Sequence, residues 1–263
     1  MMGVFKTPTM EAFPMFRWFA PVLLLVALSA PAFAQWNEDA QDCYEDTKPE
    51  SFNADKALPA CERAMRSGEL TPRNLAQMYY YRGTIWMNKK DYKRAIEDFT
   101  EAAQRDPTLP QAHQTLGFAR FFVGDFQPAA RNFADSLDLR RDDVYAMLWI
   151  YIVRSRVGEN DAKNILRQVS REVNISEWPG TLVAYYLGNM NQEALLKAAN
   201  DSDPKRRREK QCEANFYIGQ QLLIEGKKAE AAKMFKAALA TNVTKFVEYE
   251  GARVELQRMA SAK

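Results

Sequence analysis

A spacing of 34 residues constrains this chain more than any other feature of its sequence. Residues 76–109 alternate large, small and aromatic positions, and residues 110–143 repeat the pattern. The pattern positions are Tyr79, Gly83, Trp86, Ala95, Phe99, Ala102 and Pro107 in the first copy, and His113, Gly117, Phe121, Ala129, Phe133, Ser136 and Arg141 in the second. Small residues let two helices approach closely, and aromatic side chains fill the space between them. The repeat therefore predicts antiparallel helix pairs stacked along the chain.

This period and residue pattern is that of a tetratricopeptide repeat. We expect an all-α fold, a tetratricopeptide-repeat solenoid of antiparallel helix hairpins with irregular helices between repeats and a C-terminal capping helix. The expected divisions are a signal peptide at 1–34, an N-terminal capping hairpin at 35–75, repeats at 76–109 and 110–143, a degenerate repeat at 144–177, short helices and a basic loop at 178–211, a repeat at 212–245 and a C-terminal helix at 246–263. Tyr151 replaces the usual glycine of the degenerate repeat, so that hairpin should be splayed or pack extra material.

The first residues resemble a signal for export. Lys6 and Arg17 supply positive charge, an apolar run follows from 18 to 30, and Ala32-Phe33-Ala34 is a small-x-small cleavage site. The apolar run is too short to cross a bilayer comfortably. We expect cleavage near Ala34, a periplasmic or secreted mature chain with no membrane span, and no lipid anchor, because no cysteine follows the cleavage site.

If the chain is exported, its three cysteines can form disulfides. Cys43 and Cys61 lie at a spacing that suits two facing helices of one hairpin, and a disulfide forms readily in an oxidising compartment. We favour this bridge over two buried free thiols. Cys212 is left over, and we interpret it as a partly buried thiol, with an interchain bridge as the alternative.

The overall charge argues against nucleic acid as a partner. The formal net charge is only +2, with 47% hydrophobic and 27% charged residues, so an ordered chain without a concentrated basic surface is expected. The run from Lys205 to Arg208 is the local exception. It is either a basic docking patch or, as we favour, a solvated loop that leads into a helix.

No set of residues predicts catalysis, a metal or a cofactor. The only histidine, His113, takes a position that usually holds a large packing residue, and no nucleophile motif accompanies it. The sequence contains no phosphate-binding glycine loop, paired-cysteine metal motif or HExxH. We therefore expect a protein that is not an enzyme.

Helix positions outside the packing pattern predict a binding groove. Amides and aromatics alternate there, which suits a peptide or a partner helix. The predicted groove residues are Gln77, Tyr80, Thr84 and Met87 in the first repeat, and Gln111, Gln114, Phe118 and Phe122 in the second. The alternative for Phe118 and Phe122 is burial under the C-terminal helix or a dimer mate. A clamp for a C-terminal carboxylate is not expected, because the lysine and asparagine positions of such clamps hold Tyr80, Thr84, Gln114 and Phe118.

The last third of the chain resembles a particular family. The segments "YYLGNMNQEALL" and "CEANFYIGQQLLIEGKKAEAAKMFKAALATNVTKFVEYEGARVEL" are similar to the C-terminal part of the NlpI family of bacterial cell-envelope proteins. The resemblance is strongest over 178–256 and most specific in "ATNVTKFVE" at 240–248. It implies a homodimeric periplasmic adaptor for peptidoglycan hydrolases or a processing protease. Members of that type carry a lipidated cysteine where this chain has Ala34-Gln35.

These observations favour a non-catalytic periplasmic scaffold for protein–protein interaction, possessing protein or peptide partners such as peptidoglycan hydrolases or an envelope protease. The alternative is a fixed subunit of an envelope assembly or secretion complex.

Overall fold

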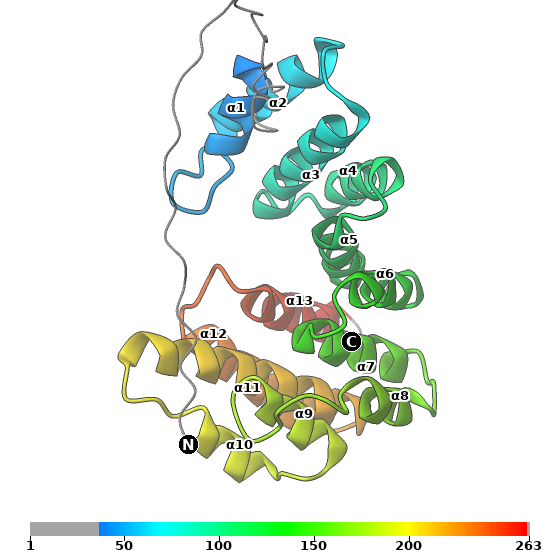
Figure 1. Ribbon diagram of the computed structural model, residues 1–263. Coiled ribbons are helices and arrows are strands. Elements are labelled where there is room, and N and C mark those ends of the chain that lie inside the picture. The colour runs from blue at the N-terminus through cyan, green and yellow to red at the C-terminus, as the bar shows by residue number, and fades with distance from the viewer. Residues whose placement is uncertain (1–36, 262–263) are drawn as a thin grey trace, which may run out of the picture. The chain divides into compact units, whose positions relative to one another are not determined.

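The structure, a computed structural model, describes residues 37–261 and contains thirteen helices and no strand within that range (Figure 1). The predicted signal peptide at 1–34 lies outside the described residues. The helices are α1 (Glu38–Glu45), α2 (Ala54–Arg66), α3 (Pro72–Asn88), α4 (Tyr92–Arg105), α5 (Pro110–Val123), α6 (Phe126–Leu139), α7 (Val144–Arg156), α8 (Ala162–Val169), α9 (Gly180–Leu187), α10 (Gln192–Ala198), α11 (Pro204–Ile224), α12 (Lys228–Ala240) and α13 (Val247–Ser261). The expected all-α fold of helix hairpins is confirmed.

Short polar side chains set where several helices begin. The Thr71 hydroxyl accepts a hydrogen bond from the backbone N–H of Asn74, and Pro72 occupies the first helical position of α3. Asp143 caps α7 in the same way through the N–H of Ala146. These groups satisfy N–H donors that have no partner within the helix.

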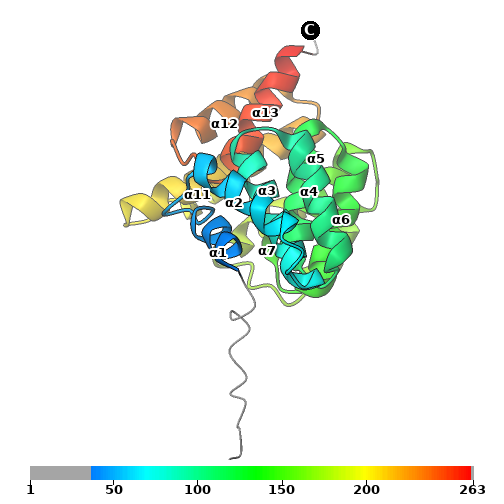
Figure 2. The same ribbon diagram turned by 90° about the horizontal axis from the view of Figure 1, so that it is seen from above.

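Three glycine–phenylalanine pairs build the hairpins that the repeat pattern predicts. A Cβ atom placed on Gly83 would lie 2.7 Å from the ring of Phe99, and one on Gly117 would lie 2.7 Å from the ring of Phe133. A third pair, in which Phe235 approaches Gly219 to 2.5 Å by the same measure, joins α11 to α12. Each phenylalanine lies sixteen positions after its glycine, so the same contact recurs in α3–α4, α5–α6 and α11–α12. Figure 2 shows helices α3 to α7 following one another along the chain.

The third hairpin departs from this plan, as the absence of its glycine suggests. Its second helix, α8, has only 8 residues, whereas α4 and α6 have 14 each. The ring of Tyr151, at the glycine position, packs against the ring of Tyr186 of α9 with their centroids 4.5 Å apart, and its hydroxyl donates a hydrogen bond of 2.9 Å to Gln221 of α11. The hairpin thus packs additional helices, which was one of the two predicted outcomes.

Trp149 of α7 lies at the centre of the largest apolar core. Its ring is fully buried and contacts Phe118 at 5.1 Å, Phe121 at 4.8 Å and Phe133 at 5.7 Å, all from the second repeat. It also contacts Phe216 of α11 at 5.2 Å. One core therefore joins the second repeat to the last one, across almost seventy residues of sequence.

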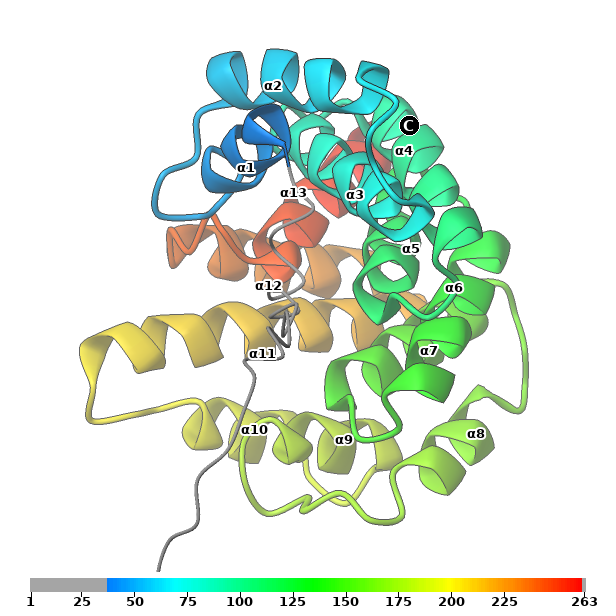
Figure 3. The same ribbon diagram turned by 45° about the horizontal axis from the view of Figure 1, so that its top comes forward.

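The basic run is helical, which corrects the prediction of a loop. Helix α11 begins at Pro204, capped by Asp203, so Lys205 to Arg208 form its first turns and the helix starts eight residues before the predicted repeat boundary at 212. Asp201 pairs with Arg206 at 3.2 Å and with Lys210 at 2.8 Å. Figure 3 shows α11 between α12 and α13 on one side and α9 and α10 on the other.

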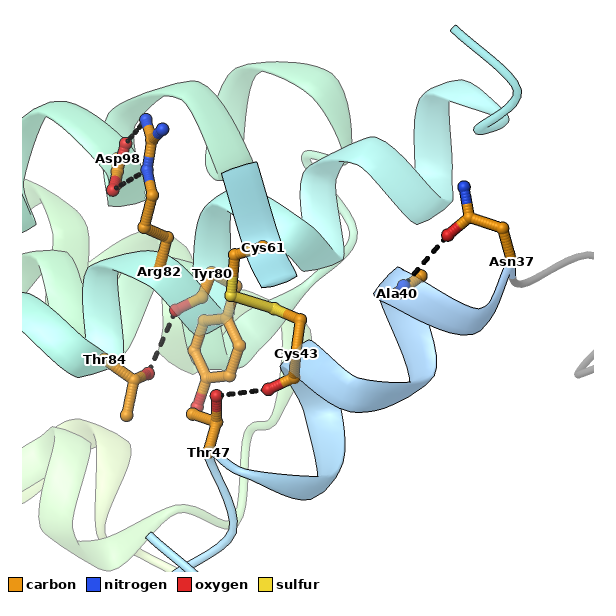
Figure 4. The surroundings of a disulfide bond; sticks show 9 residues. All are labelled: Asn37, Ala40, Cys43, Thr47, Cys61, Tyr80, Arg82, Thr84 and Asp98. Atoms are coloured by element: carbon orange, nitrogen blue, oxygen red, sulfur yellow. Dashed lines mark hydrogen bonds and ion pairs between the residues drawn. A yellow bond between two sulfur atoms is a disulfide. The ribbon is translucent and has the colours of Figure 1, made fainter. Parts of the chain in front are cut away.

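The first hairpin contains the predicted disulfide. Cys43 of α1 and Cys61 of α2 are bonded, both are fully buried, and their Cα atoms lie 4.8 Å apart (Figure 4). Thr47, two residues after the end of α1, donates a hydrogen bond to the carbonyl of Cys43, and Asn37 caps the start of that helix. Cys212 is the free cysteine of the described residues and is fully buried in α11, where burial raises the pKa of its thiol to about 12. Its burial agrees with a packing role rather than an interchain bridge.

Candidate functional site

The predicted groove residues of the first repeat lie along α3 and are partly exposed. Gln77, Tyr80, Thr84 and Met87 all retain some contact with water. The Thr84 hydroxyl donates a hydrogen bond of 3.0 Å to the backbone carbonyl of Tyr80 (Figure 4). The Tyr80 ring lies 5.8 Å from the ring of Phe99. Two of the four side chains are thus held in place by their own helix or by the hairpin partner. Whether this face binds a partner stays a prediction.

In the second repeat the two amides remain accessible. Gln111 is exposed, and Gln114 is partly exposed. The Gln114 side chain donates a hydrogen bond of 3.0 Å to Asp143 and accepts one of 3.2 Å from Arg140. Gln114 therefore already helps to fix the connection between α6 and α7.

Phe118 and Phe122 are core residues, which corrects the prediction that they line an open groove. Their exposed fractions are only 7% and 5%. Phe118 packs on Phe133 and Trp149, and Phe122 packs on Tyr92 at 5.1 Å. Helix α13 closes this region, because Arg258 hydrogen-bonds the carbonyl of Phe121 at the end of α5. Coverage by the C-terminal helix was the alternative that the sequence left open.

His113 has a structural setting in α5. One ring nitrogen lies 3.0 Å from the carbonyl of Pro107 in the connection between the repeats, and the other lies 3.7 Å from a carboxylate oxygen of Asp135. Contacts of this kind tie the repeat connection to α5 and α6. Within residues 37–261, no group of three or more histidine, cysteine, aspartate or glutamate side chains could hold a metal ion.

A cleft of about 770 Å³ lies at the degenerate third repeat. It is lined by the end of the short helix α8 and by the connection from 170 to 179 that leads to α9. Figure 1 shows where these two helices lie. The floor and walls are largely apolar, and their apolar residues are Leu137, Val144, Met147, Val169, Val173, Trp178, Pro179 and Gly180. A cleft of this volume is of the size that binds small molecules or short peptide segments.

Beside the cleft, the backbone at Gly180 packs very closely against the backbone at Asn174. A Cβ atom at this position would lie 2.0 Å from the carbonyl oxygen of Asn174, so only glycine permits the observed approach. Asn174 and Gly180 both line the cleft. The connection is therefore tightly packed where it forms the wall of the cleft. Gly180, at the end of this wall, is also the first residue of α9.

Charged side chains surround the cleft, and none of them is paired with another residue of the range 37–261. The rim residues are Asp138, Arg141, Asp142, Arg171, Glu172 and Glu177, and all six are exposed. None of their side chains takes part in a hydrogen bond or ion pair within the described residues. Some other carboxylates, such as Asp201 and Glu225, pair with neighbouring lysine or arginine. The rim of the cleft is therefore net acidic and has free hydrogen-bonding capacity.

A buried carboxyl group stands behind the cleft wall. The indole N–H of Trp178 donates a hydrogen bond of 2.6 Å to Glu213 of α11, and Tyr145 of α7 donates another of 3.1 Å to the same group. Glu248 of α13 lies close enough to interact electrostatically, and it accepts a hydrogen bond of 3.0 Å from Tyr217. Burial raises the pKa of both Glu213 and Glu248, and the charge of Glu248 raises that of Glu213 further. This network fixes Trp178 in the wall.

The cleft was not predicted from the sequence. Its residues come from α6, α7, α8, the first residue of α9 and the connections that follow α6 and α8, and no short motif joins them. Two signals were present, namely the missing glycine at Tyr151 and the Trp178-Pro179-Gly180 segment that interrupts the helical pattern. Both mark the repeat as irregular, but neither predicts an open space.

No helix within residues 37–261 is both long enough and apolar enough to cross a membrane. This finding concerns the described residues alone.

Comparison with known proteins supports the repeat. The family model described as "Tetratricopeptide repeat" matches residues 76–109, the first of the copies identified above. The chain therefore contains a tetratricopeptide repeat, a unit typical of non-catalytic scaffolds that bind other proteins. The resemblance to the NlpI family is not part of this match and stays a prediction.

Three solved structures are similar to the chain at low identity. A tetratricopeptide repeat protein from Parabacteroides merdae is 16% identical, with 83% of this chain and 98% of that chain covered and a TM-score of 0.49. The MamA protein is 19% identical over 65% of this chain and 93% of its own, with a TM-score of 0.34. The C-terminal part of a repeat-containing protein from Cytophaga hutchinsonii is 17% identical over 81% and 86%, with a TM-score of 0.26. The fold assignment accordingly rests on the matched repeat and on the recurring glycine–phenylalanine pairs.

Proposed function

We propose that this chain is an exported, non-catalytic scaffold that binds other proteins of the bacterial cell envelope. The observation that carries the proposal is the tetratricopeptide repeat at 76–109, because units of this kind build surfaces for protein partners. The predicted groove residues of α3, together with Gln111 and Gln114 of α5, are one candidate surface.

The Cys43–Cys61 disulfide supports a location outside the cytoplasm. Disulfides persist in oxidising compartments such as the periplasm and are rare where thiols are kept reduced. Together with the signal-like residues at 1–34, it favours a periplasmic or secreted chain. The similarity of the last third to the NlpI family favours peptidoglycan hydrolases or an envelope protease as partners, and a homodimer as the working form.

An affinity-tagged chain crosslinked mildly in living cells tests this function. We expect envelope proteins, with hydrolases or a protease among them, to be recovered in the periplasmic fraction. Recovery of no such protein would contradict the scaffold, and co-fractionation in a particle of fixed stoichiometry would support a permanent subunit instead. Alkylation of thiols before and after reduction tests the location separately, because Cys43 and Cys61 should react only after reduction.

Sedimentation of the purified chain tests the homodimer. A monomer at all accessible concentrations would exclude the dimer and leave the scaffold proposal intact.

A further inference from the structure

We propose that the cleft of the degenerate repeat is the docking site for a partner segment in which apolar side chains are flanked by lysine or arginine. The proposal rests on the proposed function, since it assigns that function a second surface, away from the groove predicted on α3 and α5. Three features support it, namely the apolar floor of the cleft, its acidic rim and the shortness of α8 compared with the second helices of the other hairpins.

The cleft exists because the second helix of this hairpin ends early. In the regular hairpins the second helix has 13 or 14 residues and covers its partner along most of its length. Helix α8 has 8 residues, so the end of α6 at Leu137 and the start of α7 at Val144 lack a covering helix there. The connection that replaces the missing turns lines this space.

The floor of the cleft favours apolar side chains. Val144, Val169, Val173 and Trp178 are each partly exposed within it, and Met147 closes its base with 1% of its surface exposed. Burying apolar surface of a ligand against these groups is favourable by about 25 cal/mol per Å². Small residues of a partner would leave this space unfilled.

The rim favours positive charge on both sides of those apolar side chains. Asp138 and Asp142 line the cleft from the end of α6 and from the connection to α7, while Glu172 and Glu177 line it from the connection after α8. The two arginines can donate hydrogen bonds to backbone carbonyls of a bound segment. Because no rim side chain is already paired within the described residues, a basic segment would gain ion pairs without breaking any.

The wall of the cleft is held in place before any partner arrives. Trp178 is fixed by its hydrogen bond to Glu213, and the close approach of Gly180 to Asn174 fixes the end of the connection. A site that is already ordered loses less conformational entropy on binding. The geometry therefore suits a short segment of low intrinsic order.

Titration with three labelled peptides tests the proposal on the purified chain. The probe is fluorescein-labelled Lys-Lys-Leu-Leu-Lys-Lys, and the comparison peptides are Glu-Glu-Leu-Leu-Glu-Glu and Lys-Lys-Ser-Ser-Lys-Lys. We expect the first peptide to bind at least about tenfold more tightly than either of the others. Binding of the serine peptide as tight as that of the leucine peptide would overturn the proposal, as would no measurable binding of the leucine peptide.

Paired charge reversals locate the binding. Asp142→Lys with Glu172→Lys should weaken the leucine peptide by at least about tenfold. The control pair, Glu97→Lys with Glu193→Lys, makes the same change of net charge at exposed positions outside the cleft and should leave the affinity nearly unchanged. Equal weakening by the two pairs would mean diffuse attraction to the surface and would overturn the proposal.

The indole N–H signals in an NMR spectrum give an independent readout. The peptide should shift the signal of Trp178, which lines the cleft, and leave that of the fully buried Trp149 in place. A shift of Trp149 alone would place the peptide elsewhere.

Two further results separate this proposal from its alternatives. If the chain self-associates and the Asp142→Lys, Glu172→Lys pair makes it monomeric, a second copy occupies the cleft and the peptide proposal is overturned. If envelope partners are recovered equally by the wild type and that pair, and the peptides do not bind, the cleft proposal fails while the scaffold function stands.

Discussion

At the scale of single residues, the least expected feature is the number of carboxyl groups buried at the C-terminal end of the chain. Glu213 and Glu248 are held among tyrosine and tryptophan donors without a cation, whereas Glu255 pairs with Arg156 at 2.7 Å. Burying an unpaired carboxylate is costly, so the first two groups favour their protonated forms. Glutamates that neutral surroundings keep protonated cannot be distinguished in sequence from glutamates on a helix surface.

Because burial raises the pKa of Glu213 and Glu248, the stability of the folded protein should depend on pH. A glutamate whose pKa is raised in the folded state holds a proton that the unfolded chain has released, so stability falls as the pH rises above the usual value of 4.5. We expect the midpoint of thermal unfolding to decline from mildly acidic toward mildly alkaline pH. Glu213→Gln, which keeps the shape of the side chain without the charge, should flatten this decline.

The exposed variant Glu97→Gln is the matched control and should keep the slope of the wild type. Equal slopes for all three proteins would contradict the assignment. Glu250 acts in the opposite sense, because hydrogen bonds from Arg253, Lys90 and Tyr92 outweigh its burial and lower its pKa to about 2. Its contribution to stability is lost only as the pH falls from about 4.5 toward 2.

At the scale of helices, the close approach of Gly117 to Phe133 predicts whether replacing this glycine with alanine stabilises or destabilises the protein. At an exposed helical position, replacing glycine with alanine stabilises a protein by about 1 kcal/mol. Here the added methyl group would lie 2.7 Å from a fully buried ring, so Gly117→Ala should instead lower the free energy of unfolding by about 1–3 kcal/mol. Chemical denaturation measures the difference.

Phe133→Leu provides the internal control for that experiment. Removing the ring should make Gly117→Ala less harmful than it is in the wild type, because the clash is with the ring itself. Additive effects of the two substitutions would show that the hairpin contact is placed wrongly.

The disulfide of the first hairpin makes a second prediction at this scale. It closes a loop with a sequence separation of 18, for which the entropic stabilisation is about 3 kcal/mol. Reduction, or the Cys43→Ser, Cys61→Ser pair, should lower the midpoint of thermal unfolding by on the order of 10 °C. A reductant should have no further effect on the double variant, since Cys212 is buried and unbonded.

The sequence predicts a structural feature well when the residues that determine it lie close together in the chain, and poorly when they lie in distant elements. The glycine–phenylalanine pairs and the Thr71-Pro72 helix start are local, so the repeat pattern predicted them. The burial of Phe118 and Phe122 depends on Trp149, Tyr92 and α13, which lie in other elements, and a repeat pattern cannot show that a distant helix covers its face. The cleft was missed for a related reason, because it results from the absence of helical turns.

At the scale of the described chain, α13 is the element that connects distant parts. Glu250 pairs with Lys90 at 2.7 Å, in the turn between α3 and α4, and also contacts Tyr92 and Arg253. Glu250→Ala leaves these donors without their acceptor, and we expect a loss of about 1–3 kcal/mol, reduced because Lys90 and Arg253 stay in contact with water.

Amide hydrogen exchange tests whether the Glu250→Ala substitution affects the turn between α3 and α4 as well as α13 itself. In Glu250→Ala, amides of both α13 and the α3–α4 turn should exchange faster than in the wild type. Gln257→Ala, at an exposed position of the same helix, should change neither segment. Faster exchange in α13 alone would show that the contact with the first repeat contributes nothing.

The same contacts also set the order of events as the chain folds. Lys90 and Glu250 are 160 residues apart in sequence, and Lys245 reaches the carbonyl of Pro49 across 196 residues. An open array of repeats can nucleate anywhere and grow from neighbour to neighbour, but contacts of such high contact order form only after the intervening chain is in place. The first repeats can therefore assemble early during synthesis, while the turn at Lys90 acquires its partner only when the last helix has been made.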